Sequence, residues 1–124
     1  MTQKILLIED EPDLAAAVQV RLETRGYKVS IAYDGQEGLA KARTENPDLI
    51  ILDIMLPKID GYKVCRMLKF DEKYQKIPVI MFSARAQEKD RELAKECGAD
   101  DYYLKPFEPE PFLARIQELL ERPK

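Results

Sequence analysis

The sequence has no histidine, only two cysteines and no apolar run long enough to cross a bilayer. Cys65 and Cys97 lack the C-x-x-C spacing of a zinc site, and no histidine is present to complete one. We therefore interpret both as reduced cysteines that serve as small apolar residues. The 20 basic residues are scattered instead of forming a stripe, which argues against direct binding of nucleic acid. Residues 1–4 are too few for a signal peptide before the first strand, so we expect a cytoplasmic protein without membrane contact.

Glycine is also scarce, with 5 in 124 residues, whereas 8 prolines is an ordinary number, and a composition of 45% hydrophobic and 35% charged residues is unlike that of disordered chains. A chain of this length buries one continuous core without disulfides or a structural metal. No linker, repeat or low-complexity tract interrupts the sequence. We therefore expect residues 1–124 to form a single domain.

Hydrophobic periodicity alternates between strand-like runs and helix-like segments, which is typical of βα units around a parallel sheet. The pattern predicts strands over 4–8, 28–32, 49–52, 79–82 and 101–104. It predicts helices over about 12–26, 62–70, 87–97 and 111–120, and one between the turn pair Asp34-Gly35 and Asn46-Pro47. The continuously apolar run at 49–52 indicates a central strand that is covered on both faces. The expected fold is α/β, a doubly wound five-stranded parallel sheet with strand order 2-1-3-4-5.

Reactive or charged residues follow four of the five predicted strands. The first strand ends in Glu9-Asp10, the third in Asp53, the fourth in Ser83 and the fifth in Lys105. Ligands of open parallel sheets bind outside the carboxyl ends of the strands. With strands one and three as neighbours, the three carboxylates are expected to share a small volume.

Such crowding of carboxylates needs compensation. Two carboxylates about 5 Å apart repel by roughly 3 kcal/mol at an effective dielectric near 20. Hard oxygen ligands suit Mg²⁺, which keeps several waters and accepts phosphate oxygens. We expect Lys105 to supply a fixed positive charge on the opposite side of the site. A carboxylate nucleophile, a metal, an ammonium and a hydroxyl together suit phosphoryl transfer.

Taken singly, each of these residues has a structural interpretation. Asp13 and its acidic neighbours complement a helix dipole, Asp53 or Ser83 can cap a helix, and Lys105 can cover apolar surface. Reactive or charged residues at four separate strand ends would rarely meet at one edge of the sheet if they were only ordinary polar surface residues. As a set, the residues favour a functional site.

Four stretches carry a resemblance to a known family. They are ILLIEDEPDL, PDLIILDIMLPKIDG, PVIMFSAR and GADDYYLKPFEP, in that order. At these residues the whole chain resembles the CheY-like response-regulator receiver family of two-component systems, and its motifs are most similar to receivers of winged-helix (OmpR-type) transcription factors. The resemblance implies a flavodoxin-like (βα)5 three-layer sandwich. It also implies a phosphoryl group taken from the phosphohistidine of a sensor histidine kinase or phosphotransfer protein.

The resemblance implies a role for each residue of the site. Asp53 is implied to be the phosphoacceptor, with Asp10 as a direct Mg²⁺ ligand, Glu9 as a ligand through water and the Met55 backbone carbonyl as the third protein contribution. Mn²⁺ is a plausible substitute for Mg²⁺. Lys105 would pair with the phosphoryl oxygens.

Three further implications of the resemblance concern the switch that follows phosphorylation. The Ser83 hydroxyl would move to bond the phosphoryl group, and Tyr102 would rotate inward behind it. A cis peptide is implied between Lys105 and Pro106. Added charge and strong acceptors at Asp53 would thereby change the distant surface of the fourth helix, fifth strand and fifth helix.

That surface carries charged residues that resemble the dimer face of the winged-helix subfamily. They are Lys89, Arg91, Asp100, Asp101 and Arg115. Pro111 departs from the usual acidic residue there, and whether Glu110 reaches the same partner is left open. The expected partners are a downstream effector or output domain and, after phosphorylation, a second copy of the chain. No output domain is expected within residues 1–124.

Other functions fit the residues less well. A haloacid-dehalogenase-like phosphatase needs a second acid where Met55 stands, and a flavodoxin-like FMN binder would have its phosphate repelled by Glu9-Asp10-Glu11. A receiver-like interaction module that works without phosphorylation is the remaining alternative, although none of Asp10, Asp53 and Lys105 is lost. We do not expect an enzyme with a separate substrate, because the family promotes only its own phosphorylation and dephosphorylation.

Overall fold

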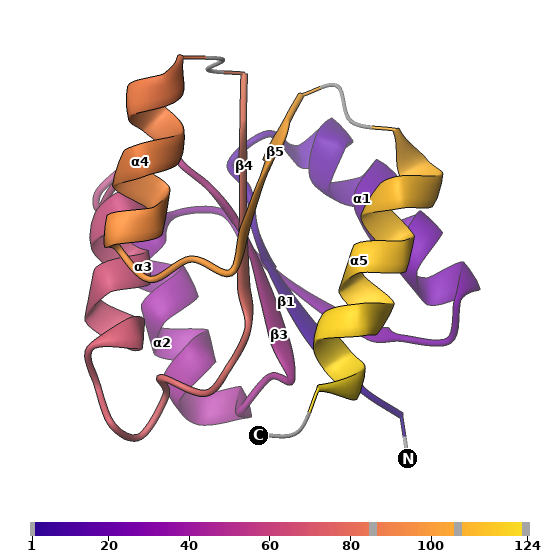
Figure 1. The fold of residues 1–124 in the computed structure, drawn as a ribbon. Coiled ribbons are helices and arrows are strands. Elements are labelled where there is room, and N and C mark those ends of the chain that lie inside the picture. The colour runs from indigo at the N-terminus through magenta and orange to yellow at the C-terminus, as the bar shows by residue number, and fades with distance from the viewer. Residues whose placement is uncertain (1, 85–86, 106–107, 123–124) are drawn as a thin grey trace.

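One parallel sheet organises the chain in the computed structural model, which describes residues 2–84, 87–105 and 108–122 (Figure 1). The strands are β1 (Lys4–Ile8), β2 (Lys28–Ala32), β3 (Leu49–Asp53), β4 (Val79–Ser83) and β5 (Asp101–Leu104). Their order is β2-β1-β3-β4-β5, and every neighbouring pair is parallel. The predicted strand order is confirmed.

Helices cover both faces of the sheet and make it the middle of three layers (Figure 1). The helices α1 (Pro12–Thr24) and α5 (Pro109–Glu121) lie on one face. The helices α2 (Gly35–Glu45), α3 (Gly61–Lys69) and α4 (Glu88–Glu96) lie on the other. The three-layer sandwich expected from the sequence is therefore present.

Alternation along the inner strands divides the core between the two faces. On β1, Leu6 and Ile8 pack with the α2 and α3 side, whereas Ile5 and Leu7 pack with the α1 and α5 side. Every residue of β3 is buried, as expected for a central strand. Each fully buried Leu or Ile contributes about 1.5–3 kcal/mol, so the sheet is a rigid base for the residues that follow its strands.

Two Asp-Gly pairs begin helices. Asp34 caps α2 by accepting a hydrogen bond from the Glu37 amide at 2.8 Å, and Asp60 caps α3 by accepting one from Lys63 at 3.0 Å. The helix α3 therefore begins one residue earlier than predicted. The helix α5 begins two residues earlier, because Pro109 occupies its first turn, where a missing amide proton costs nothing.

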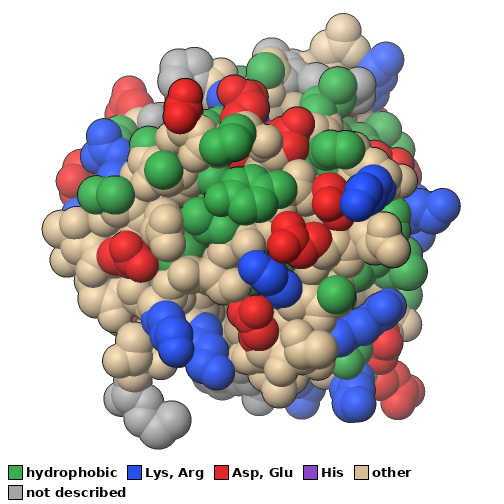
Figure 2. Space-filling model, turned by 180° about the vertical axis from the view of Figure 1, so that it is seen from behind, with side chains coloured by type: hydrophobic (Ala, Val, Ile, Leu, Met, Phe, Trp, Pro, Cys, Tyr) green, Lys and Arg blue, Asp and Glu red, His purple; other side chains and the backbone are tan. Residues whose placement is uncertain are grey.

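Both cysteines are buried and free, as interpreted from the sequence. Cys65 Sγ lies 3.4 Å from the Cys97 carbonyl oxygen, and burial raises the pKa of the Cys65 thiol to about 12. Within the described part of the chain, no helix has both the length and the apolar character needed to cross a membrane. Figure 2 shows acidic and basic side chains mixed over one face, around a small group of apolar side chains.

Candidate functional site

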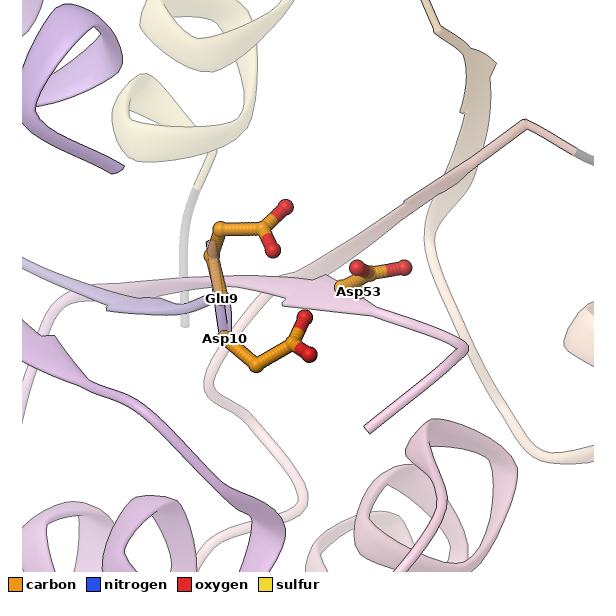
Figure 3. Close-up of side chains that lie close together, drawn as sticks. All are labelled: Glu9, Asp10 and Asp53. Atoms are coloured by element: carbon orange, nitrogen blue, oxygen red, sulfur yellow. The ribbon is translucent and has the colours of Figure 1, made fainter. Parts of the chain in front are cut away.

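Three carboxylates meet at the carboxyl ends of β1 and β3. The pairing of Ile8 with Leu52 places Glu9 and Asp10 beside Asp53, and the three side chains lie close together (Figure 3). One carboxylate oxygen from each lies within 4.8 Å of the others. Glu9 and Asp53 are buried, whereas Asp10 is exposed to solvent. The predicted convergence of these three residues is therefore observed.

Lys105 lies against two of these carboxylates. Its Nζ donates to Glu9 Oε1 at 2.7 Å and to Asp53 Oδ2 at 3.0 Å. The lysine side chain passes over the Phe82 ring, with Nζ 4.8 Å from the ring centroid. The sequence placed this charge on the opposite side of the site, but the structure places it in direct contact with both acids. The reason is that β5 is separated from β3 only by β4, within reach of a long side chain.

The surroundings of Glu9 shift its pKa upward. Burial raises the pKa of Glu9 to about 7, although hydrogen bonds from Lys105 and the Glu11 amide oppose the rise. The nearby Asp53 carboxylate raises it further. Burial alone would lower the pKa of Lys105, but its bonds to the two acids outweigh burial and raise it. Lys105 is thus held as an ammonium at neutral pH.

Asp53 is held by two donors, one on each oxygen. The Met55 amide donates to Oδ1 at 3.1 Å, and Lys105 contacts Oδ2. Met55 is 54% exposed, whereas Asp53 itself is only 3% exposed. These bonds fix the orientation of the carboxylate before any ligand arrives. A contribution of the Met55 carbonyl to a metal stays a prediction.

The donor set fits a small, hard divalent cation. The candidate ligands are carboxylate oxygens, which Mg²⁺ and Mn²⁺ prefer, and one of them comes from a side chain open to water. Lys105 partly offsets the negative charge of Glu9 and Asp53, which leaves a net negative site. The residues therefore fit the expected cation.

Ser83 and Tyr102 lie on β4 and β5, the two strands beyond β3 in the sheet. Ser83 follows Phe82, which pairs with Asp53, and its side chain is fully buried. Tyr102 on β5 is only 7% exposed, and the Arg91 guanidinium carbon lies 5.2 Å from the centroid of its ring. Tyr102 is therefore already buried in this structure, and its role in a switch stays a prediction. The predicted cis peptide at Lys105-Pro106 lies outside the described residues.

Charged residues of the predicted dimer face form ion pairs within the chain. Arg115 Nε lies 2.7 Å from Asp101 Oδ2, and Asp100 contacts Lys69 at 2.9 Å and Arg122 at 3.0 Å. Glu110, whose partner the sequence left open, lies 3.3 Å from the guanidinium of Arg25, the residue that follows α1. Dimerisation through the surface of α4, β5 and α5 stays a prediction.

Comparison with known families and proteins agrees with this geometry. Residues 5–117 match the family described as response regulator receiver domain. The chain is 46% identical over 122 residues to the alkaline phosphatase synthesis transcriptional regulatory protein PhoP of Bacillus subtilis, covering 98% of this chain and 50% of that protein. It is 47% identical over 119 residues to the DNA-binding dual master transcriptional regulator RpaA of Synechocystis, covering 96% and 49%. The chain thus spans about half the length of the curated relatives it matches.

Solved structures show the same fold along nearly the whole chain. A putative response regulator from Chloroflexus aurantiacus superposes with a TM-score of 0.94 at 31% identity, covering 98% of this chain and all of that one. The BeF3-activated DrrB receiver domain superposes with a TM-score of 0.89 at 34% identity, with coverage of 98% and 100%. Because the family match extends over most of the sequence and the fold agrees, the chain belongs to the response regulator receiver domain family.

Proposed function

We propose that Asp53 accepts a phosphoryl group from the phosphohistidine of a histidine kinase or phosphotransfer protein. The observation that carries this assignment is the double hold on its carboxylate by Lys105 and the Met55 amide, beside two further acids. An Asp53 oxygen attacks phosphorus, a P–O bond forms and the P–N bond breaks. The electron pair of that bond returns to the imidazole, which takes up a proton.

The chain's own groups provide most of the charge stabilisation for this step. Lys105 already contacts Asp53 Oδ2, so its ammonium is placed to stabilise the negative charge that develops on the phosphoryl oxygens during transfer. Asp10, Asp53 and the Met55 carbonyl would hold Mg²⁺ or Mn²⁺ directly, with Glu9 acting through water. The bound cation supplies positive charge that offsets the negative charge of the transferring group.

The role of the chain is regulatory, and its chemistry is confined to its own phosphorylation and dephosphorylation. A phosphorylated Asp53 carries new acceptor oxygens, toward which the buried Ser83 hydroxyl is drawn. Tyr102 then holds its inward position behind Ser83, and the surface of α4, β5 and α5 changes. We propose that residues 1–124 act as one receiver unit that regulates an effector or output domain through this surface.

A phosphorylation-dependent homodimer is the finer form of this proposal. The α4, β5 and α5 surface carries Arg91, Asp101 and Arg115, charges of both signs that a two-fold axis could pair. Light scattering before and after phosphorylation tests it. A doubling of mass supports the dimer, and an unchanged monomer removes it.

Intact-mass measurement after treatment with acetyl phosphate and Mg²⁺ tests the acceptor role. The wild-type chain should gain the mass of one phosphoryl group, Asp53→Ala should gain none, and chelation of the metal should suppress the gain. Asp48→Asn is the matched control, because Asp48 stands just before the first residue of β3, at the opposite end of the strand from Asp53. A wild-type chain that gains no mass would favour the phosphorylation-independent interaction module instead.

A further inference from the structure

The segment between β3 and α3 contacts the first turn of α2. This segment, residues 54–60, is called the acceptor loop. The Gly35 amide donates to the Pro57 carbonyl oxygen at 3.3 Å. A Cβ added to Gly35 would overlap the Ile59 carbonyl oxygen and lie 2.9 Å from the Ile59 carbonyl carbon. Both neighbours are backbone atoms, so the loop itself would have to move. Only glycine allows the loop this close to the helix.

A second link joins the same two segments. Lys58 Nζ lies 3.4 Å from Asp34 Oδ2, and Asp34 also caps α2. Lys58 has φ of 69°, a left-handed conformation that a lysine adopts at some cost. The Ile59 amide closes a tight turn onto Pro57 at 2.8 Å. The loop is therefore held in this shape by its contacts with α2.

The helix α2 is itself fitted against β1. A Cβ added to Gly38 would lie 2.5 Å from Ile8 Cδ1, so the helix approaches the strand closely just before Glu9 and Asp10. One helical turn thus touches β1 through Gly38 and the acceptor loop through Gly35. The first turn of α2 sets the distance between the acids of β1 and the loop that carries Met55.

We propose that Gly35 is a positioning residue for the divalent cation. This inference rests on the proposed function and adds a part of the chain, the first turn of α2, that touches neither cation nor phosphoryl group. Gly35 contacts the loop at Pro57 and Ile59, and through them it would position Met55, whose carbonyl would join Asp10 and Asp53 around one ion. A side chain at position 35 lifts the loop and spoils that arrangement, while Asp10 and Asp53 stay in place.

Calorimetric titration of the metal-free protein with Mn²⁺ and Mg²⁺ tests the proposal. Gly35→Ala should weaken metal affinity by about tenfold and raise the Mg²⁺ concentration for half-maximal phosphorylation, with the maximal rate much less affected. In the metal-free protein, the Ile59 and Gly61 amides, which donate to the loop carbonyls of Pro57 and Ile54, should exchange hydrogen faster. This last measurement does not depend on metal.

Two variants complete the design. Gly26→Ala introduces the same methyl group at a left-handed glycine with nothing within 4 Å of the added atom, and it should leave metal affinity unchanged. Lys58→Ala removes the exposed ion pair to Asp34 and should weaken affinity about twofold. If Gly35→Ala does not fold, Lys58→Ala decides, and unchanged affinity there overturns the proposal. Wild-type affinity in folded Gly35→Ala overturns it directly, whereas a wild-type chain that binds no cation overturns the proposed function instead.

Discussion

The ammonium of Lys105 lies 2.7 Å from Oε1 of Glu9, a residue 96 positions earlier in the chain. Glu9 is fully buried, and the same ammonium contacts Asp53. Lys105 therefore reduces the repulsion among the carboxylates when no metal ion is bound. It is also already beside the carboxylate that would receive the phosphoryl group. One side chain thus links the stability of the domain to its chemistry.

Lys105→Met should destabilise the metal-free protein by about 3 kcal/mol, because it leaves two buried carboxylates without their cationic partner. Urea unfolding in the presence of a chelator measures this loss. Lys58→Met is the matched control, since its ion pair with Asp34 is exposed and should contribute less than about 1 kcal/mol. Adding Glu9→Gln to Lys105→Met should recover part of the loss. Equal effects of the two single lysine variants would contradict the account.

Mg²⁺ should stabilise the wild-type chain against heat. A ligand at about 100 times its dissociation constant adds about 2.7 kcal/mol when it binds only the folded state. Asp10→Asn should remove most of this gain, because it takes away one charged ligand at the solvent side of the cluster. Asp48→Asn should keep the gain. Equal stabilisation of Asp10→Asn and the wild type would place the cation elsewhere.

Local patterns predicted the elements and the edge at which they converge. Periodicity located all five strands to within one residue, and the apolar run of β3 identified the central strand. The residues at the carboxyl ends of β1, β3 and β5 could be assigned to one site because parallel strands end at one edge. Helix starts were less accurate, because Asp60 and Pro109 were not recognised as the cap and the first turn of their helices.

Contacts between distant segments could not be obtained from such patterns. The Asp34-Gly35 pair was correctly recognised as the entry to a helix, although Gly35 is already its first residue, but nothing local shows that the acceptor loop touches Gly35. The hydrogen bond between Tyr62 and Asp90 joins α3 and α4. The hydrophobic pattern of the sequence does not distinguish either residue from an ordinary surface residue. The direct contact of Lys105 with Glu9 depends on side-chain reach across the sheet. Each of these requires the packed structure.

The lowered pKa of the Asp100 carboxyl should make the free energy of unfolding depend on pH in the acid range. Burial raises its pKa, but bonds from Lys69, the Val79 amide and Arg122 outweigh burial, and the net pKa lies below 3.8. A carboxyl with a lowered pKa stabilises the fold above its unfolded value and loses that contribution as pH falls through its folded value. Asp100→Asn should therefore cost about 1–3 kcal/mol at neutral pH and progressively less below about pH 4. Unfolding curves across this range measure it, with exposed Glu72→Gln as control.

Tyr62→Phe should destabilise the fold by about 1 kcal/mol, because it removes the hydroxyl that donates to buried Asp90 at 3.1 Å. The ring and its packing are unchanged by this substitution. Tyr33→Phe is the matched control at a side chain that is 45% exposed, and it should have little effect. Chemical denaturation of both variants compares them. Equal stabilities would mean that water or another donor serves Asp90 equally well.

The identity of the acceptor is tested most directly by locating the phosphoryl group in the chain. Treating the phosphorylated protein with borohydride reduces an aspartyl phosphate to homoserine, which tandem mass spectrometry of the peptides can then place. Homoserine at position 53, and at no other aspartate, is the result that the geometry of Lys105, Met55 and Asp53 predicts. Homoserine at position 10 or 48, with Asp53 intact, would contradict it.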